Sequence, residues 1–264
     1  MELDRILVAR HALSGGNFAG IIQGQLNTPI QPGYKTNVAK LTDLIITTES
    51  LRQLEPGISI YVVHSGLDRA FYTASGIHQG LRERRIHSGV LPIPELTERG
   101  AGMLEGKTYA EAAMLLQPHI SPNIVLEPTP ESIYPHLYSI DGVLGMESHQ
   151  MAEARLKEAL KRIQDLRGVV VVVGHAISDM NYLRNLMTKG NILGENSESY
   201  QRFPNLSVVR LERERYRKEE RFPQRLFAMG REPPYTVTGT YGPPNSNGQP
   251  NGAAVAPPLH QTNR

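Results

Sequence analysis

The sequence predicts an α/β protein in which helices cover both faces of a mostly parallel central sheet, giving three α/β/α layers. Short apolar stretches alternate with amphipathic helical patterns along the chain, and the run Gly168 to Val173 has the uninterrupted valines typical of a strand buried on both faces. The length of 264 residues suits one domain of about 200 to 250 residues plus an extension. We expect that domain over residues 1–229.

Three strands and two helices follow from these patterns. Residues 3–8, 58–63 and 168–173 read as strands. Apolar residues recur at helical spacing from Val38 to Leu54, before Pro56 and Gly57, and again from Ala152 to Ile163, before Gly168. Helices placed between strands favour parallel pairing, and ligands of such sheets bind beyond the carboxyl ends of the strands.

Two regions depart from this alternation. Five prolines lie between Leu115 and Gly145 and predict an inserted cap or a long substrate-side loop over about residues 112–145. The charged stretch 210–221 favours a solvated strand end or helix face. Residues 230–264 are rich in Pro, Gly and Asn, a composition that cannot offset its ordering entropy by burial, so we expect a disordered tail.

Composition excludes several classes of function. A net charge of +2 provides no basic field for a nucleic-acid partner. No apolar run is long enough to span a membrane, and the N-terminal residues lack a secretory pattern, so we expect a cytoplasmic protein. The absence of cysteine rules out disulfides and thiolate catalysis. The nine histidines form no H-E-x-x-H pattern, so we expect neither a metal nor another cofactor.

Reactive side chains follow the predicted strands. Arg10 and His11 follow the first strand, His64, Ser65 and then Arg69 follow the second, and His175 follows the third. Parallel strands bring these ends to one edge, where two histidines and two arginines make a positive pocket suited to a phosphoryl group. Glycines 15 and 16, with Ser14 and Asn17, let backbone N–H groups and short polar side chains approach the same anion.

Other motifs carry less. The segment GAGMLEG at 100–106 does not follow an apolar strand and lacks the spacing of a dinucleotide or P-loop. The chain has no G-x-S-x-G elbow, which argues against the common serine hydrolases. Histidine remains as the candidate nucleophile.

With these pieces placed, the chain resembles the histidine phosphatase superfamily, the group of cofactor-dependent phosphoglycerate mutases and many small phosphatases. The resemblance runs from about Leu3 to Leu211, and its five segments are RHALSGGN (10–17), HSGLDRAFYTA (64–74), ELTERGAGMLEGKTYAEA (95–112), MESHQMAEAR (146–155) and a valine-rich strand ending in GHAISDM (174–180). It implies the phosphoglycerate mutase-like form of the α/β/α fold.

The resemblance also implies roles for single residues. It makes His11 the phosphoryl acceptor, Glu98 the acid for the leaving group and His175 the second catalytic histidine. Phosphate contacts are expected from Arg10, Ser14, Asn17, Gln23, Gly24, Arg69 and Ala176. The chain departs from the family pattern at Ala12 and Ala176, which replace glycines, at Leu13, which replaces an acidic residue, and at Met146, which replaces the glycine of G-E-S. An alanine at position 12 or 176 is strained only if its φ is positive.

Three expectations about mechanism follow. A neutral His11 needs a backbone acceptor on its other ring nitrogen, His175 can be cationic, and Glu98 needs a raised pKa to act as an acid. No Lys or Arg lies between Lys107 and Arg155, which favours hydrolysis over a mutase reaction. We expect Tyr134, Tyr138, His119 and His136 on the leaving-alcohol side.

The substrate is expected to be a phosphorylated small molecule. A mutase and a noncatalytic relative that binds phosphorylated ligands or proteins stay open as alternatives, as does a homodimer.

Overall fold

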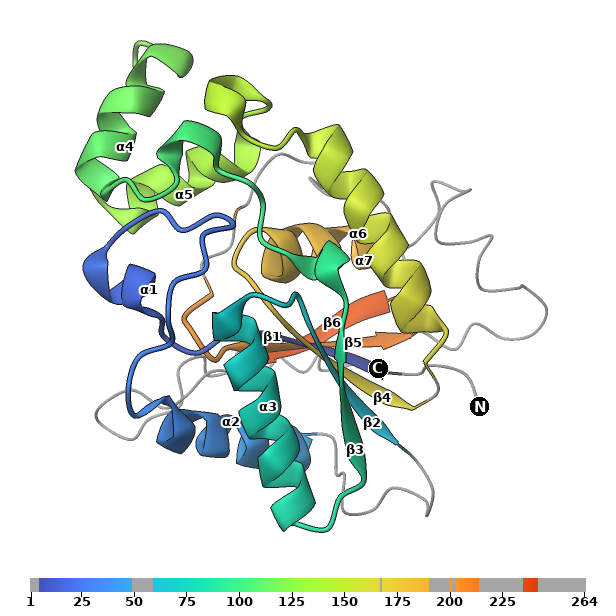
Figure 1. The fold of residues 1–264 in the computed structure, drawn as a ribbon. Coiled ribbons are helices and arrows are strands. Elements are labelled where there is room, and N and C mark those ends of the chain that lie inside the picture. Colours follow the sequence, from blue (N-terminus) through green and yellow to red (C-terminus); the bar gives the residue numbers. More distant parts are fainter. Residues whose placement is uncertain are drawn as a thin grey trace, which may run out of the picture.

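The structure is a computed structural model that describes residues 5–48, 59–166, 168–189, 200, 203–213 and 235–241. One sheet of six strands runs through its centre in the order β3-β2-β4-β1-β5-β6 (Figure 1). The predicted strands are β1 (Arg5–Arg10), β2 (Ile60–His64) and β4 (Val169–Gly174); the others are β3 (Ser88–Pro92), β5 (Val208–Arg213) and β6 (Tyr235–Tyr241). The pairs β1–β4, β2–β4 and β2–β3 are parallel, whereas β5 runs antiparallel to β1 and to β6.

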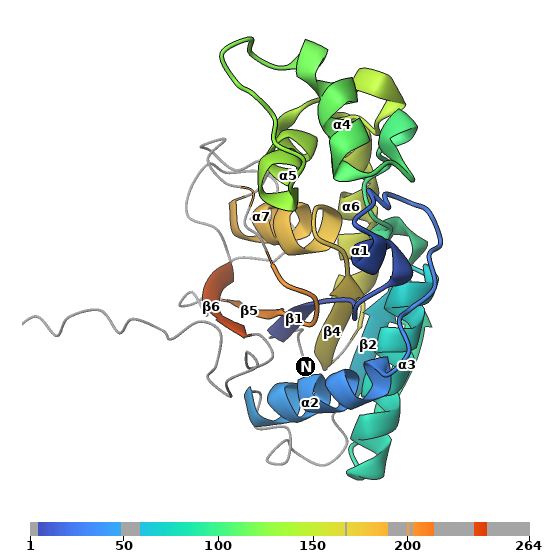
Figure 2. The same cartoon turned by 90° about the vertical axis from the view of Figure 1, so that its left-hand side faces the viewer.

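Helices cover both faces of the sheet, which confirms the predicted α/β/α layering. Figure 2 shows α2 (Tyr34–Thr48) and α3 (Asp68–Glu83) beside one face and α6 (His149–Gln164) and α7 (Arg184–Lys189) beside the other. Strand side chains alternate between two cores: Leu7 and Ala9 pack with α2 and α3, while Ile6 and Val8 pack with α6 and α7. All the valines of β4 are buried, as expected for a strand covered on both sides.

The predicted helices are present with shifted ends. α2 starts at Tyr34, before the periodic residues, and the rest of the span expected to reach Leu54 lies outside the described residues. α6 starts at His149 because the Ser148 side chain accepts a hydrogen bond from the Met151 N–H and caps the helix.

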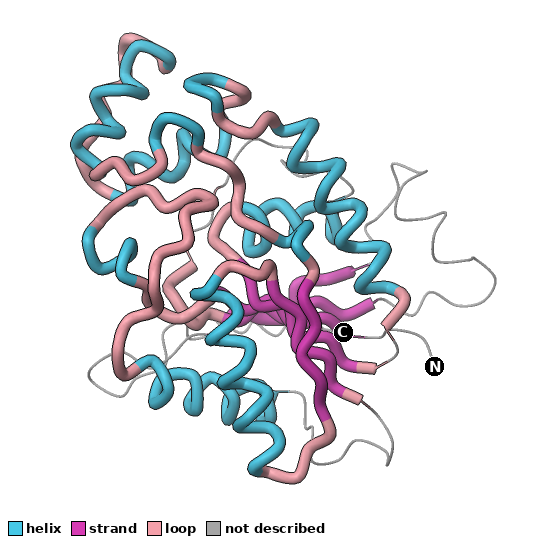
Figure 3. The backbone as a smooth tube through the Cα atoms, in the orientation of Figure 1, coloured by secondary structure: helices cyan, strands magenta, loops and turns pink. Residues whose placement is uncertain are grey.

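The region expected to be irregular contains helices. α4 (Tyr109–Leu116) and α5 (Pro130–Ser139) form the cap above the carboxyl edge of the sheet, and Figure 3 shows loop segments gathered between this cap and the strands. Reading the prolines as interruptions was wrong at α5. Pro130 occupies the first turn, where no helical N–H bond is lost, and Thr129 caps the helix. Pro135 lies inside the helix, but burial of Ile133 and Leu137 holds it in place.

The C-terminal expectation also meets one difference. Residues 235–241 fall in the stretch expected to be a tail, yet they form β6 at the sheet edge. Their sequence, YTVTGTY, is rich in the β-branched and aromatic residues that favour strands. The other residues from 230 onward lie outside the described part, as do residues 214–221 of the charged stretch, whose first four residues belong to β5. No helix within the described ranges is long and apolar enough to cross a bilayer.

Candidate active site

Strand register brings the two candidate catalytic histidines together. β1 pairs with β4 so that Arg10 lies opposite Gly174, and the His11 N–H donates to the Gly174 carbonyl at 3.0 Å. His11 and His175, the residues that directly follow β1 and β4, therefore lie beside each other. The ring centroids of His11 and His175 are 5.2 Å apart, and both residues are buried. The expected meeting of strand ends is present.

His11 is held as a neutral base. Its Nδ1 lies 2.7 Å from the Ala12 carbonyl oxygen, which can only accept, so Nδ1 carries the proton and Nε2 keeps its lone pair. Burial, and then the positive charges of Arg69 and Arg10, hold the pKa of His11 well below its ordinary value. The expected backbone acceptor is thus present, and the ring suits nucleophilic attack.

The surroundings of His175 also favour its neutral form. Its Nε2 lies 2.8 Å from the Ser65 hydroxyl, and its buried Nδ1 has no hydrogen-bond partner among the described residues. Burial, followed by the positive charges of Arg69 and Arg10, keeps the pKa of His175 well below the ordinary value.

The two arginines are arranged to bind an anion. Arg69 lies in the first turn of α3, is almost fully buried, and donates through Nη1 to the Leu26 carbonyl (2.6 Å) and through Nη2 to the Gly24 carbonyl (2.7 Å). Burial lowers the pKa of Arg69 to about 10, which leaves it charged at neutral pH. Arg10 donates to the Phe203 carbonyl. The Nε atoms of Arg10 and Arg69 are buried without a partner in the described part of the chain, so both are free to meet phosphate oxygens.

Residues of the first loop divide into two groups. Gln23 and Gly24 line the cavity. Ser14 and Asn17 are not among its lining residues: Ser14 caps α1 (Gly15–Ala19), its N–H donating to Asn17 Oδ1 at 3.2 Å, and its hydroxyl lies 2.7 Å from Gln23 Oε1. Gly16 is required here, since a Cβ would come within 2.4 Å of Gln23. Ser14 and Asn17 thus shape the loop that presents Gln23.

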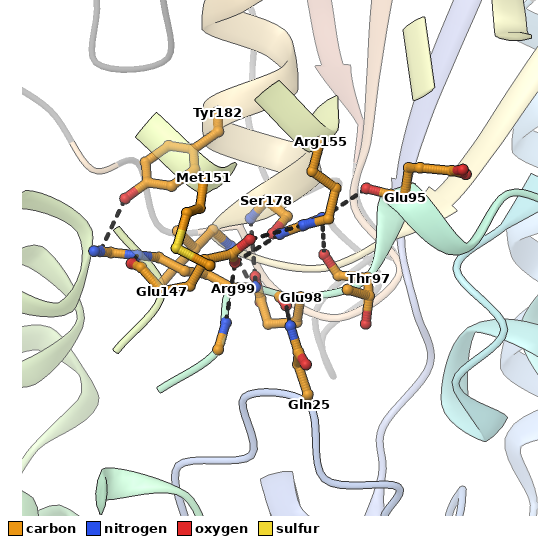
Figure 4. A network of polar contacts seen from close by, with 12 residues as sticks. Gln25, Glu95, Thr97, Glu98, Arg99, Glu147, Met151, Arg155, Ser178 and Tyr182 are labelled. Carbon is orange, nitrogen blue, oxygen red and sulfur yellow. Dashed lines mark hydrogen bonds and ion pairs between the residues drawn. The ribbon is translucent and has the colours of Figure 1, made fainter. Parts of the chain in front are cut away.

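Glu98 points into the site from a rigid frame of hydrogen bonds. Its Oε1 accepts from the N–H groups of Arg99 (2.9 Å) and Ser178 (2.9 Å), and its Oε2 accepts from that of Ile177 (3.2 Å). Oε1 thus accepts two hydrogen bonds and Oε2 accepts one. Figure 4 shows how the segment around Glu98 is tied to α6.

That tie is a partly buried ion pair. Arg155 of α6 binds both carboxylate oxygens of Glu147, at 2.9 and 2.8 Å, and also donates to the carbonyls of Glu95 and Thr97 (Figure 4). Glu147 in turn accepts from the Gly100 N–H at 3.2 Å. These contacts hold residues 95–100, which include Glu98, against α6.

One cavity collects most of the predicted residues. It encloses about 470 Å³ of empty space including its open mouth, and Glu98, Arg10, His11, Gln23, Gly24, Arg69 and Ala176 line it. The four residues expected on the leaving-alcohol side lie in different places. Tyr134 lines the cavity, Tyr138 is buried in the core, His136 is half-buried and His119 is exposed. Neither Ala12 nor Ala176 has a positive φ, so alanine at these positions adds no backbone strain.

Three residues that hydrogen-bond His11 or His175 were not predicted as site residues from the sequence. Ser65 was noted only as part of a strand end, although its position after His64 was the available signal. Asn205 donates through Nδ2 to the His11 carbonyl at 2.9 Å, and Asp179 Oδ2 accepts from the His175 N–H at 2.8 Å; no motif announced either. Within the described residues, no group of three or more His, Cys, Asp or Glu side chains is placed to hold a metal ion.

Comparisons with known proteins agree with this geometry. A family model described as "Histidine phosphatase superfamily (branch 1)" matches residues 6–222. A comparison with curated proteins finds no match.

Solved structures share the fold at low sequence identity. A phosphoglycerate mutase from Bacillus anthracis superposes with a TM-score of 0.57 at 18% identity, covering 80% of this chain and 88% of the mutase. A mycobacterial glucosyl-3-phosphoglycerate phosphatase gives 0.52 at 18% identity, covering 80% and 91% of the two chains. The Bacillus stearothermophilus protein YhfR gives 0.56 at 19%, covering 80% and 92%. The same fold thus serves a phosphatase and a mutase.

Proposed function

The chain belongs to the histidine phosphatase superfamily, branch 1, and from that premise we propose that it hydrolyses phosphomonoesters of small molecules through a phosphohistidine on His11. Membership supports phosphatase-type activity in general. The specific proposal is carried by one observation: a buried, neutral His11 whose Nδ1 is fixed by the Ala12 carbonyl, in a cavity with two arginines whose buried Nε atoms lack partners among the described residues.

Binding begins at the two guanidiniums. The Nε–H groups of Arg10 and Arg69 offer charge-assisted hydrogen bonds to the phosphate oxygens, and burial strengthens such bonds. These fixed charges also stabilise the negative charge on the equatorial oxygens in the transition state. The ring of His175 lies beside His11, although His175 is not among the residues that line the cavity.

Phosphoryl transfer to the enzyme follows. His11 Nε2 attacks phosphorus in line with the leaving oxygen, an N–P bond forms and the ester P–O bond breaks with its electron pair on oxygen. Glu98 donates a proton to that oxygen, so the alcohol leaves uncharged.

Hydrolysis returns the enzyme to its starting state. Glu98, now a carboxylate, takes a proton from a water molecule as the water oxygen attacks phosphorus. The N–P bond breaks with its electron pair on Nε2, and inorganic phosphate leaves. Water and the ester are consumed, and alcohol and phosphate are produced.

A mutase reaction is the main alternative, because the fold also serves a phosphoglycerate mutase. Hydrolysis is favoured by the absence of Lys and Arg between Lys107 and Arg155, since a mutase must retain a bisphosphate intermediate while it turns over. Incubation with 3-phosphoglycerate and a bisphosphate primer separates the two: isomerisation supports the mutase, whereas no isomerisation together with release of inorganic phosphate from 4-nitrophenyl phosphate supports hydrolysis.

The direct test is to trap the intermediate. We expect rapid quenching with 4-nitrophenyl phosphate to give acid-labile, base-stable phosphate on the wild-type protein and none on His11→Ala. His119→Ala, at an exposed position on the cap, serves as the matched control and should retain the label. Turnover surviving in His11→Ala would overturn the mechanism, and binding of phosphate esters without turnover in the wild type would favour the noncatalytic relative.

A further inference from the structure

The wall of the cavity away from the arginines points to the class of leaving group. We propose that the site takes monophosphate esters of uncharged, apolar alcohols such as phenols, and discriminates against esters that carry a second anionic group. This inference rests on the proposed function, whose phosphate position it adopts.

The first argument is the apolar surface that the leaving group meets. Ile22, Leu137, Met146 and Ile177 line the cavity, and each is at most 5% exposed. They come from four separate segments of the chain, so the wall is built by the fold and not by one loop. Apolar surface removed from water here favours an apolar ligand.

Tyr134 adds an aromatic edge to that wall. Its ring stacks on Tyr200 with centroids 5.7 Å apart and planes 10° apart, and it meets the Tyr109 ring edge-on at 6.2 Å. Burial raises the pKa of the Tyr134 phenol above its ordinary value, so the group stays uncharged. A rigid, neutral aromatic ring suits a planar apolar ligand.

Arg99, the third arginine that lines the cavity, already uses its donors in hydrogen bonds within the protein. Arg99 lines the cavity, but its Nε donates to the Glu147 carbonyl at 2.8 Å and its Nη2 to the Ile140 carbonyl at 2.8 Å. Its Nη1 donates to the Leu137 carbonyl and to the Tyr182 hydroxyl. Arg99 thus braces the cap to the sheet and has little left to offer an anion.

A nearby arginine is committed in the same way. Arg155 is not among the lining residues, and its ion pair with Glu147 and bonds to two carbonyls use its donors. Of the described residues that line the cavity, only Arg10 and Arg69 keep free guanidinium donors, and the phosphate needs both. A carboxylate or second phosphate on the leaving group would find no further free cation among the described lining residues and would share the cavity with Glu98, an unfavourable arrangement.

Three substrates of similar shape test this directly. Phenyl phosphate, 4-carbamoylphenyl phosphate and 4-carboxyphenyl phosphate differ by a neutral amide and an isosteric carboxylate at one position. We expect kcat/KM to fall at least tenfold from the carbamoyl to the carboxy ester, and less from phenyl to carbamoyl. A carboxy ester hydrolysed as well as the carbamoyl ester would overturn the proposal.

A binding measurement separates this inference from the proposed function. The corresponding phosphonates, which cannot be hydrolysed, are titrated calorimetrically into the wild-type protein. Binding of the carbamoyl compound at least tenfold tighter than the carboxy compound supports the apolar site even if no ester is turned over, in which case the phosphatase proposal alone fails. Equal or reversed affinities overturn the inference even if the enzyme is an active phosphatase.

A charge placed in the wall gives the converse test. Met146→Lys introduces the missing cation into the cavity, while Met114→Lys makes the same change at an exposed position of α4 that is 76% exposed. We expect Met146→Lys to raise the carboxy-to-carbamoyl ratio of kcat/KM at least tenfold and Met114→Lys to leave it unchanged. If Met146→Lys does not fold, as judged by circular dichroism, the wild-type ratios decide the question.

Discussion

The Ser65 hydroxyl lies 2.8 Å from Nε2 of His175, whose ring centroid is 5.2 Å from that of His11. Ser65 comes from the end of β2 and the two histidines from the ends of β4 and β1, so three neighbouring strands each supply one member of this chain of contacts. The orientation of His175 therefore depends on a residue that does not line the cavity.

Replacing that hydroxyl should slow the chemistry more than it weakens binding. A hydrogen bond of this kind contributes about 0.5–1.5 kcal/mol, so we expect Ser65→Ala to lower kcat by roughly 3- to 10-fold with little change in KM. Ser88→Ala is the matched control, because Ser88 also bonds a histidine, His78 Nδ1 at 2.9 Å, away from the cavity. Steady-state kinetics that show equal losses in both variants would remove Ser65 from the proposed machinery.

The buried histidines should make the fold sensitive to mild acid. Because the pKa values of His11 and His175 lie below their ordinary value in the folded state, the unfolded chain binds more protons as pH falls below about 6.5. Stability is therefore fully present above that pH and is lost below it, by about 1.4 kcal/mol per pH unit for each histidine. We expect the free energy of unfolding, measured with urea between pH 7.5 and 5.5, to depend less steeply on pH in His11→Asn, by about 1.4 kcal/mol per pH unit. Ser65→Ala removes no titrating group and should keep the pH dependence of the wild type.

Asp179 should respond to pH in the opposite direction. Burial and the nearby Glu98 raise the pKa of Asp179 well above its ordinary value, and Oδ1 has no partner among the described residues. A raised pKa contributes stability at acidic pH that is lost as pH rises. Asp179→Asn abolishes this titration and keeps an acceptor for the His175 N–H, so its stability relative to wild type should increase from pH 5 to pH 8. Thermal unfolding at both values checks this, and a difference that does not change with pH would contradict it.

Two glycines separate backbone strain from steric clash. Gly102 (φ 55°) and Gly142 (φ 63°) both adopt left-handed backbone, but an added Cβ at Gly102 would lie 2.3 Å from the Leu144 carbonyl, whereas at Gly142 nothing lies within 4 Å. Gly142→Ala should cost about 1–2 kcal/mol from strain, and Gly102→Ala about 1–3 kcal/mol more from overpacking. Chemical denaturation of the two variants measures the difference, and equal losses would mean that the loop at Leu144 relaxes freely.

The sequence predicted the parts of the site that follow from strand patterns and local motifs. His11 and His175 could be placed together because a parallel sheet aligns the residues that follow its strands, and Arg69 could be added because it begins the helix after β2. The same reasoning could not separate Gln23, which lines the cavity, from Ser14 and Asn17, which cap α1.

What escaped prediction depends on contacts between distant segments. The partners of Arg99 are mainly backbone carbonyls from the cap and from Glu147, and a carbonyl leaves no mark in a sequence because every residue has one. The lowered pKa of His175 could not be predicted for a similar reason: desolvation and the charges of nearby arginines act on the ring only once the fold has buried it. Pro135 within α5 shows packing overriding a local helix-breaking preference.

The register of β1 against β4 also constrains how the protein folds. Paired residues of these strands, such as Arg10 and Gly174, are 164 positions apart in the sequence, yet the pairing sets the spacing of His11 and His175. Closing so long a loop is entropically costly and slow, and a register shift by one residue would turn the flanking side chains to opposite faces. No partly folded form that lacks this pairing can present the two rings side by side, so recovery of activity during refolding reports on completion of the central sheet.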